Sequence, residues 1–233
     1  MPNPYDPIKL SAYKANMQLP KLGLVIFTFG NVSAADRSLG VFAIKPSGVP
    51  YDELSPDNMV IVDFNGKTVE GKLHPSSDTQ THAVLYKHWE KIGGIAHTHS
   101  TYATSWAQGQ RDIPIFGTTH ADHLPVDIPC APPMSDEMIK GDYEYETGFQ
   151  IMNCLKDRTL SYEEVEMILV GNHAPFTWGK TPEKAVYNSA VLETVAHMAW
   201  LTEQLNPDAP RLKAALIKKH FERKHGPDSY YGQ

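Results

Sequence analysis

Two histidines close an apolar run of the chain and could hold a metal ion. The segment 93–100 reads Gly-Gly-Ile-Ala-His-Thr-His-Ser, so His97 and His99 stand two residues apart. On a β-strand successive side chains point to opposite faces, and this spacing would aim both imidazoles the same way, with Cα atoms roughly 6.5–7 Å apart. Two imidazoles on one face can bind one divalent ion at about 2.0–2.1 Å each. Taken alone, the pair fits two solvated histidines at a strand end equally well.

Two further segments favour the metal site. Residues 170–173 end another apolar run with His173, and residues 75–78 place Asp78 in a loop of small residues. Three histidines and one aspartate, each at or next to a strand end, are a suitable set of donors for a divalent ion.

Three short loops rich in Gly, Ser and Asn are candidates for binding a phosphate. They span residues 28–33, 45–48 and 75–78. Such loops can aim backbone N–H groups and hydroxyls at a phosphate, and Lys45 would add a positive charge. None of them is a nucleotide-binding fingerprint, and each alone is typical of a turn. Together with the metal candidate they indicate a phosphorylated substrate.

Three further polar or aromatic features of the sequence could contribute to a site or to a subunit contact. Asp122 follows a Thr-Thr-His-Ala run and could line a cleft, although a solvated or capping aspartate has the same pattern. The basic segment 218–224 is typical of a solvated helix face, or contacts a phosphate or a neighbouring subunit. The closing segment 229–233 carries two tyrosines, which is unusual for a chain end and suggests docking on the core or on another subunit.

Composition excludes several classes of protein. The 233 residues carry a net charge of −6, which argues against a general nucleic-acid binder or a protein of anionic membranes. We therefore expect no nucleic acid and no membrane among its partners. No secretory-type start or membrane-length apolar run is present, and two cysteines are too few for a disulfide framework. We expect one domain over residues 1–233, reduced thiols and a cytoplasmic location.

The elements that position these residues follow from periodicity and capping signals. Helices are predicted over 7–17, 78–89, 103–108, 135–155 and 211–224, and from Thr181 onward with a core stripe that ends at Met198 and Leu201. Strands are predicted over 24–29, 41–45, 58–64 and 165–170, with a hairpin turn at 65–66 leading into 67–70. This irregular alternation predicts an α/β protein with a mixed sheet flanked by helices.

The motifs, taken in order, resemble the class II aldolase/adducin family over nearly the whole chain. They are Gly-Asn-Val-Ser at 30–33, Lys-Pro-Ser-Gly-Val at 45–49, Pro-Ser-Ser-Asp-Thr at 75–79, His-Thr-His-Ser at 97–100, Gly-Thr-Thr-His-Ala-Asp at 117–122 and Lys-His-Gly at 224–226. The resemblance implies a three-layer α/β/α fold with a central, mainly antiparallel sheet. It also implies a homotetramer with active sites between subunits.

The resemblance also implies roles for individual residues. One zinc ion per subunit would be bound by His97, His99 and His173, with Asp78 as ligand or near-ligand. The substrate phosphate and nearby atoms would be held by Gly30, Asn31, Lys45, Ser47, Gly48, Ser76 and Ser77. Asp122 and Tyr231 would be the acid/base pair, and Tyr231 and His220 would serve a neighbour's site.

Within the family, the pattern is closest to the members that epimerise a ketopentose phosphate at C4. The expected reaction is the zinc-dependent interconversion of L-ribulose 5-phosphate and D-xylulose 5-phosphate, in pentose catabolism of the L-arabinose or L-ascorbate type. Aldolases of the family resembling fuculose-phosphate aldolase carry Glu where this chain has Asp78, which favours the epimerase. The chain departs from the family pattern at Ala174 and at 123–125. A sugar-phosphate aldolase, an adducin-like binding module and a generic zinc hydrolase are the alternatives, and no His-Glu-x-x-His helix supports the last.

Overall fold

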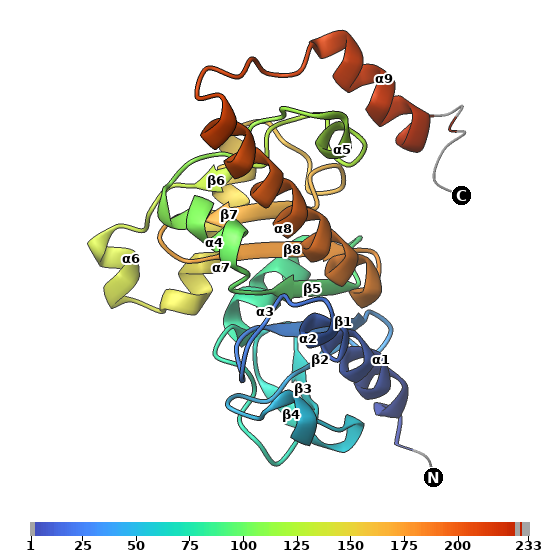
Figure 1. Ribbon diagram of the computed structural model, residues 1–233. Coiled ribbons are helices and arrows are strands. Elements are labelled where there is room, and N and C mark those ends of the chain that lie inside the picture. The colour runs from blue at the N-terminus through green and yellow to red at the C-terminus, as the bar shows by residue number, and fades with distance from the viewer. Residues whose placement is uncertain (1–2, 227–228, 230–233) are drawn as a thin grey trace.

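A single mixed sheet forms the centre of the protein. The computed structural model describes residues 3–226 and 229. Its eight-stranded sheet has the order β4-β3-β2-β1-β5-β8-β7-β6 (Figure 1). The strands are β1 (Asn31–Asp36), β2 (Val41–Ile44), β3 (Val60–Asp63), β4 (Thr68–Glu70), β5 (Gly94–His97), β6 (Cys130–Ala131), β7 (Met167–Val170) and β8 (Pro175–Gly179). All neighbours pair antiparallel except β6 and β7, which confirms the predicted α/β class with a mainly antiparallel sheet.

Helices cover both faces of this sheet. The helices are α1 (Asp6–Asn16), α2 (Gln18–Lys21), α3 (Thr79–His88), α4 (Thr101–Gln108), α5 (Thr118–Ala121), α6 (Asp136–Lys140), α7 (Tyr143–Asp157), α8 (Pro182–Leu205) and α9 (Ala214–His225). Two short 3₁₀ turns, Tyr51–Glu53 and Pro56–Asn58, precede β3. Helix α1 packs on β1 and β2, α8 packs on β5 and β8, and α3 packs against α7.

Neighbouring residues of β5 show the two sides of the sheet. Ile95 belongs to a buried apolar cluster that includes Leu85 of α3. Ala96 belongs to a separate cluster that includes Ala12 of α1. Because side chains alternate along a strand, His97 faces the same side as Ile95. The protein therefore has three layers, and the first candidate metal ligand lies under the α3 layer.

The segment 24–29 is not a strand, contrary to its β-branched and aromatic composition. It lies at the surface, where Ile26 is 62% and Phe27 79% exposed. Phe27 also has a φ of +53°, which breaks the extended conformation. The strand is the next segment, β1, whose Val32 and Ala34 are buried.

Two helix predictions also need correction. The segment 135–155 forms two helices, because the chain turns at Gly141 and the Asp142 side chain accepts a hydrogen bond from the backbone N–H of Tyr145, starting α7. In α8 the Thr181 cap is confirmed, but Met198 and Leu201 are not in the core. They are 48% and 42% exposed.

Both cysteines, Cys130 and Cys154, are free and buried, as expected. None of the helices in the described part of the chain is long and apolar enough to cross a bilayer.

Gly94 is the closest point between β5 and α8, and we predict that Gly94→Ala destabilises the protein. A Cβ there would lie 2.3 Å from the Cα of Pro182, a backbone atom that cannot move without shifting α8. Overpacking of this kind costs about 1–3 kcal/mol or more, which lowers the unfolding midpoint by roughly 2–10 °C at this chain length. The measurement is thermal unfolding followed by circular dichroism.

Gly109→Ala is the matched control. Its Cβ would meet only ordinary contacts at 3.4 Å. We expect its midpoint to stay within a degree or two of the wild type, roughly the ±0.5 kcal/mol range of harmless substitutions. Equal midpoints for the two variants would contradict the close packing of β5 on α8.

Candidate metal centre and phosphate-binding cavity

His97 is fixed in place before any ligand binds. It ends β5, is 2% exposed, and stacks on Phe176 of β8 with ring centroids 4.1 Å apart. Its Nδ1 donates a hydrogen bond of 2.9 Å to the carbonyl oxygen of Pro175. This bond sets the tautomer, so the lone pair is on Nε2 and points away from Pro175.

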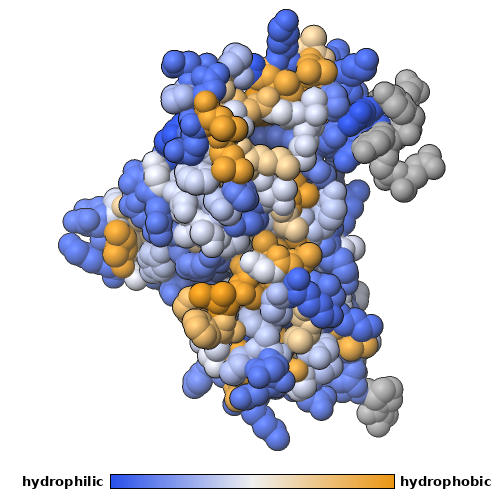
Figure 2. Space-filling view, in the orientation of Figure 1, coloured by the Kyte–Doolittle hydropathy of each residue, from blue (hydrophilic) through white to orange (hydrophobic). Residues whose placement is uncertain are grey.

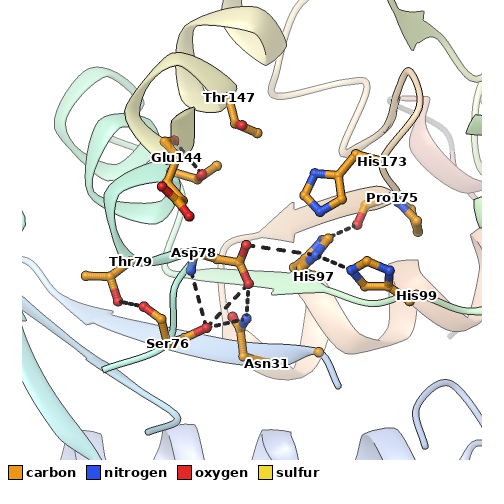
Figure 3. A network of polar contacts seen from close by, with 12 residues as sticks. Asn31, Ser76, Asp78, Thr79, His97, His99, Glu144, Thr147, His173 and Pro175 are labelled. Atoms are coloured by element: carbon orange, nitrogen blue, oxygen red, sulfur yellow. Dashed lines mark hydrogen bonds and ion pairs between the residues drawn. The ribbon is translucent and has the colours of Figure 1, made fainter. Parts of the chain in front are cut away.

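His99 and His173 come to the same place from different segments. His99 lies two residues past the end of β5, and its Nε2 is 3.1 Å from Nε2 of His97. His173 lies on the turn between β7 and β8, after Asn172 with a φ of +63°. The ring of His173 lies 4.9 Å from that of His97 and 5.3 Å from that of His99, centroid to centroid. Figure 3 shows the three rings around one small space.

The three histidines fit a divalent metal ion. One nitrogen of each lies within 4.8 Å of the others. Nitrogen ligands of a tetrahedral ion with bonds of about 2.0–2.1 Å are roughly 3.3 Å apart. Burial lowers the pKa of each of the three imidazoles, to about 4 for His173. Neutral imidazoles with converging lone pairs are the form that binds metal, because no proton has to leave first.

Asp78 lies beside this cluster. One carboxylate oxygen is 4.0 Å from Nε2 of His97, and the other accepts hydrogen bonds from Asn31 at 2.7 Å and Ser76 at 3.3 Å. Burial alone would raise the pKa of Asp78, but the nearby histidines and the Asn31 hydrogen bond hold it below its usual value. Asp78 precedes α3 without capping it, so its carboxylate is a charged group turned toward the histidines (Figure 3).

A cavity of about 430 Å³ connects the histidines with the three polar loops. His220, also predicted to bind the substrate, does not line it, but the other seven residues predicted to bind the substrate or its phosphate do, together with the four predicted metal ligands. They are Gly30, Asn31, Lys45, Ser47, Gly48, Ser76 and Ser77, and Asp78, His97, His99 and His173. Residues from five separate segments of the sequence thus meet in one place.

Lys45 is the cation of this cavity. It is 2% exposed, and its Nζ contacts the carbonyl oxygens of Thr28 at 3.3 Å and Pro46 at 3.4 Å. No ion pair recorded among the described residues includes Lys45. Burial lowers its pKa to about 8, and the ammonium gains little from two weak carbonyl contacts. An anionic ligand in the cavity would satisfy it.

Asn31 supplies an acceptor that is still open. Its Nδ2 donates to Ser76 and Asp78, whereas its buried Oδ1 has no hydrogen-bond partner among the described residues. Buried acceptors are nearly always paired in folded proteins. The hydroxyl of a ligand would pair this one.

Sequence reasoning missed Tyr143 and Glu144, which also line the cavity. The Tyr143 hydroxyl is 3.5 Å from Nδ1 of His173. Both residues belong to the first turn of α7. In the single helix predicted over 135–155 they would lie in the middle of the helix and not at its start. The Gly141-Asp142 pair was the available signal, because glycine followed by a capping residue can end one helix and start another.

Asp122 and His220 meet in a second cluster outside the cavity. Asp122 follows α5, and α9 supplies His220, whose Nδ1 lies 2.9 Å from the Asp122 carboxylate. Arg223 of α9 donates two further hydrogen bonds to this carboxylate. Neither Asp122 nor His220 lines the cavity. Figure 1 shows α5 and α9 side by side at one end of the protein, and Tyr231 lies outside the described residues.

Comparison with known proteins gives the family. The sequence pattern of the family described as Class II Aldolase and Adducin N-terminal domain matches residues 11–200. An L-fuculose 1-phosphate aldolase superposes with a TM-score of 0.77 at 23% identity, over 96% of this chain and 97% of that protein. YgbL from Klebsiella pneumoniae gives 0.71 at 21% identity, over 94% and 99%. L-fuculose 1-phosphate aldolase from Glaciozyma antarctica PI12 gives 0.75 at 16% identity, over 94% and 81%.

At these identities the superpositions show a shared fold. The matched family pattern spans most of the chain, and it contains the three histidines and the polar loops that line the cavity. The chain therefore belongs to the class II aldolase/adducin family.

Proposed function

We propose that the protein is a zinc-dependent epimerase that interconverts L-ribulose 5-phosphate and D-xylulose 5-phosphate. The observation that carries this proposal is a single cavity with a cluster of three histidines and a buried ammonium, Lys45, whose recorded contacts among the described residues are two carbonyl oxygens and the Tyr51 ring, with no carboxylate. The histidines suit a metal that binds ketose oxygens, and Lys45 suits a phosphate. A phosphorylated ketose carries both groups.

Epimerisation at C4 of a 2-ketose calls for cleavage of a carbon–carbon bond. The hydrogen on C4 is β to the carbonyl, so its removal as a proton would leave a carbanion without an adjacent electron sink. Cleavage of C3–C4 avoids this, because C4 leaves as an aldehyde and the negative charge is shared with the C2 carbonyl. Rotation of the aldehyde and addition to its other face then invert C4.

A bound zinc ion would supply Lewis acidity for the negative charge that develops on the ketose oxygens. His97, His99 and His173 would hold this ion, with the Asp78 carboxylate beside it. The open Oδ1 of Asn31 would accept a hydrogen bond from a substrate hydroxyl.

Retention of the aldehyde distinguishes an epimerase from an aldolase. Lys45, Ser47 and Ser76 would anchor the phosphate while the aldehyde group turns, so that the fragment stays in the cavity. Asp78 favours this assignment because its side chain is one methylene shorter than Glu, and hydrogen bonds from Asn31 and Ser76 hold one of its oxygens.

The two proton-transfer groups would come from a neighbouring copy in a homotetramer. Asp122 does not line the cavity of its own chain, which supports a site that a second copy would complete with its Asp122 and Tyr231. Helix α8 has exposed apolar residues that such an assembly could cover, and Figure 2 shows apolar patches on this side of the protein. The exposed apolar residues of α8 are Tyr187, Met198, Trp200, Leu201 and Leu205.

We predict that His173→Ala loses the metal. Removing one of three ligands should weaken binding by at least the roughly 10–100-fold that loss of a ligand's hydrogen-bond partner costs. Metal content after dialysis against a weak chelator, measured by mass spectrometry, checks this. His88→Ala is the control, because His88 is exposed on α3 and its one recorded ring contact within residues 3–226 is edge-on to Phe149. Equal metal content in both variants would show that the histidines hold no ion.

The reaction itself is tested by product analysis. We expect zinc-loaded protein to convert L-ribulose 5-phosphate to D-xylulose 5-phosphate with little free glycolaldehyde phosphate. A chelator should abolish this conversion and added Zn²⁺ should restore it. Free aldehyde without the epimer would make the protein an aldolase, and the absence of both products would refute a catalytic role toward this sugar.

A further inference from the structure

The Asp122 carboxylate is held by three donors from α9. Arg223 donates from Nε to Oδ1 at 2.9 Å and from Nη2 to Oδ2 at 2.8 Å. Nδ1 of His220 lies 2.9 Å from Oδ1. Asp122 is 9% exposed, so these contacts replace most of its hydration. A short helix and a C-terminal helix, about 100 residues apart in sequence, are thereby tied together.

The two oxygens of Asp122 are left in different states. A carboxylate oxygen accepts about two hydrogen bonds. Within residues 3–226, Oδ1 has two neighbouring donors and is saturated, whereas Oδ2 has one and keeps a lone pair open toward them. A proton arriving from outside the cluster would therefore bind at Oδ2.

The groups around Asp122 favour its ionised form. Helix α9 also brings Lys224 and His225, and Nε2 of His225 is 3.1 Å from the Asp122 carbonyl oxygen. His123 is the next residue in the chain. Burial lowers the pKa of His123, and the nearby positive charge of Lys184 on α8 lowers it further. Burial would raise the pKa of Asp122, but the hydrogen bonds from Arg223 and His220 lower it below its usual value.

We propose that Arg223 is a positioning residue that clamps Asp122 and leaves Oδ2 as the atom that exchanges a proton with the C4 hydroxyl. This inference rests on the proposed function. The O–H bond of the C4 hydroxyl breaks, and its proton forms an O–H bond on Oδ2. The electron pair left on the C4 oxygen becomes the second bond of the aldehyde C=O, while the C3–C4 pair moves to C3. Addition to the other face of the aldehyde runs these bond changes in reverse, with the proton for the new C4 hydroxyl coming from the second proton-transfer group.

The planar fork of arginine matters as much as its charge. Two parallel hydrogen bonds fix the plane of the carboxylate, and a lysine ammonium at the same place would keep the charge without fixing the plane. Arg223→Gln should therefore lower kcat by roughly 10–100-fold, a loss typical of a misplaced reacting group, with KM changed much less. Arg223→Lys should lie between Arg223→Gln and the wild type.

A kinetic double-mutant cycle separates this role from a structural one. If Arg223 acts through Asp122, Arg223→Gln should change kcat by less than about 3-fold in an Asp122→Asn background, because coupled residues are not additive. Lys218→Gln is the control. Lys218 is an exposed charge on the same helix that pairs with Glu222, and its removal should leave kcat unchanged. Metal content should stay at the wild-type level in all of these variants.

The following outcomes decide the proposal. The proposal would be overturned if Arg223→Gln lowered kcat by the same factor in the Asp122→Asn background as in the wild type. It would also be overturned if Arg223→Gln changed KM alone. If Arg223→Gln does not fold, the same cycle with Arg223→Lys gives the answer. If the zinc-loaded wild type releases aldehyde and forms no epimer, the epimerase proposal fails, while the cycle measured on aldehyde release still tests the clamp. A wild type without either activity overturns both.

Discussion

Burial of His97 between β1 and β8 is the constraint on which the candidate site depends. The ring has no room to turn, because it stacks on Phe176 and donates to the carbonyl of Pro175. Its Nε2 is therefore aimed at the space that His99 and His173 also face. Desolvation keeps these imidazoles neutral. The free protein therefore does not have the free-energy cost of burying charged imidazoles, and the positive charge enters the site only with the metal ion.

The residues of the cavity could largely be predicted from the sequence, but their arrangement could not. The motifs led to the polar loops around Lys45 and to the three histidines, because several short motifs in one order are far more specific than any one of them alone. The strand expected over 24–29 was wrong, since apolar composition cannot tell an exposed loop from a buried strand. Tyr143 was missed because the helix break at Gly141-Asp142 was not predicted. Arg223 lies in the basic segment 218–224, but its partner Asp122 could not be predicted, because only a tertiary contact brings the two together.

The proposed function would divide its chemistry between two regions that the fold of one chain keeps apart. One has neutral imidazoles and a buried Lys45 that an anion would satisfy. The other holds an ionised Asp122 among cationic groups of α9. A group that exchanges protons and a group that binds an anion interfere less when each keeps its own electrostatic surroundings. Assembly of copies would then bring them together only in the complete enzyme.

Complementation between two inactive variants tests this account most directly. His173→Ala would lose the metal half of the site, and Asp122→Asn would lose the proton-transfer half. Co-expressed with different tags and purified as hybrids, they should regain activity, because roughly a quarter of the sites in a random one-to-one cyclic assembly would combine two intact halves. Hybrids no more active than either parent would contradict a site shared between chains. Chains of each variant purified alone provide the baseline.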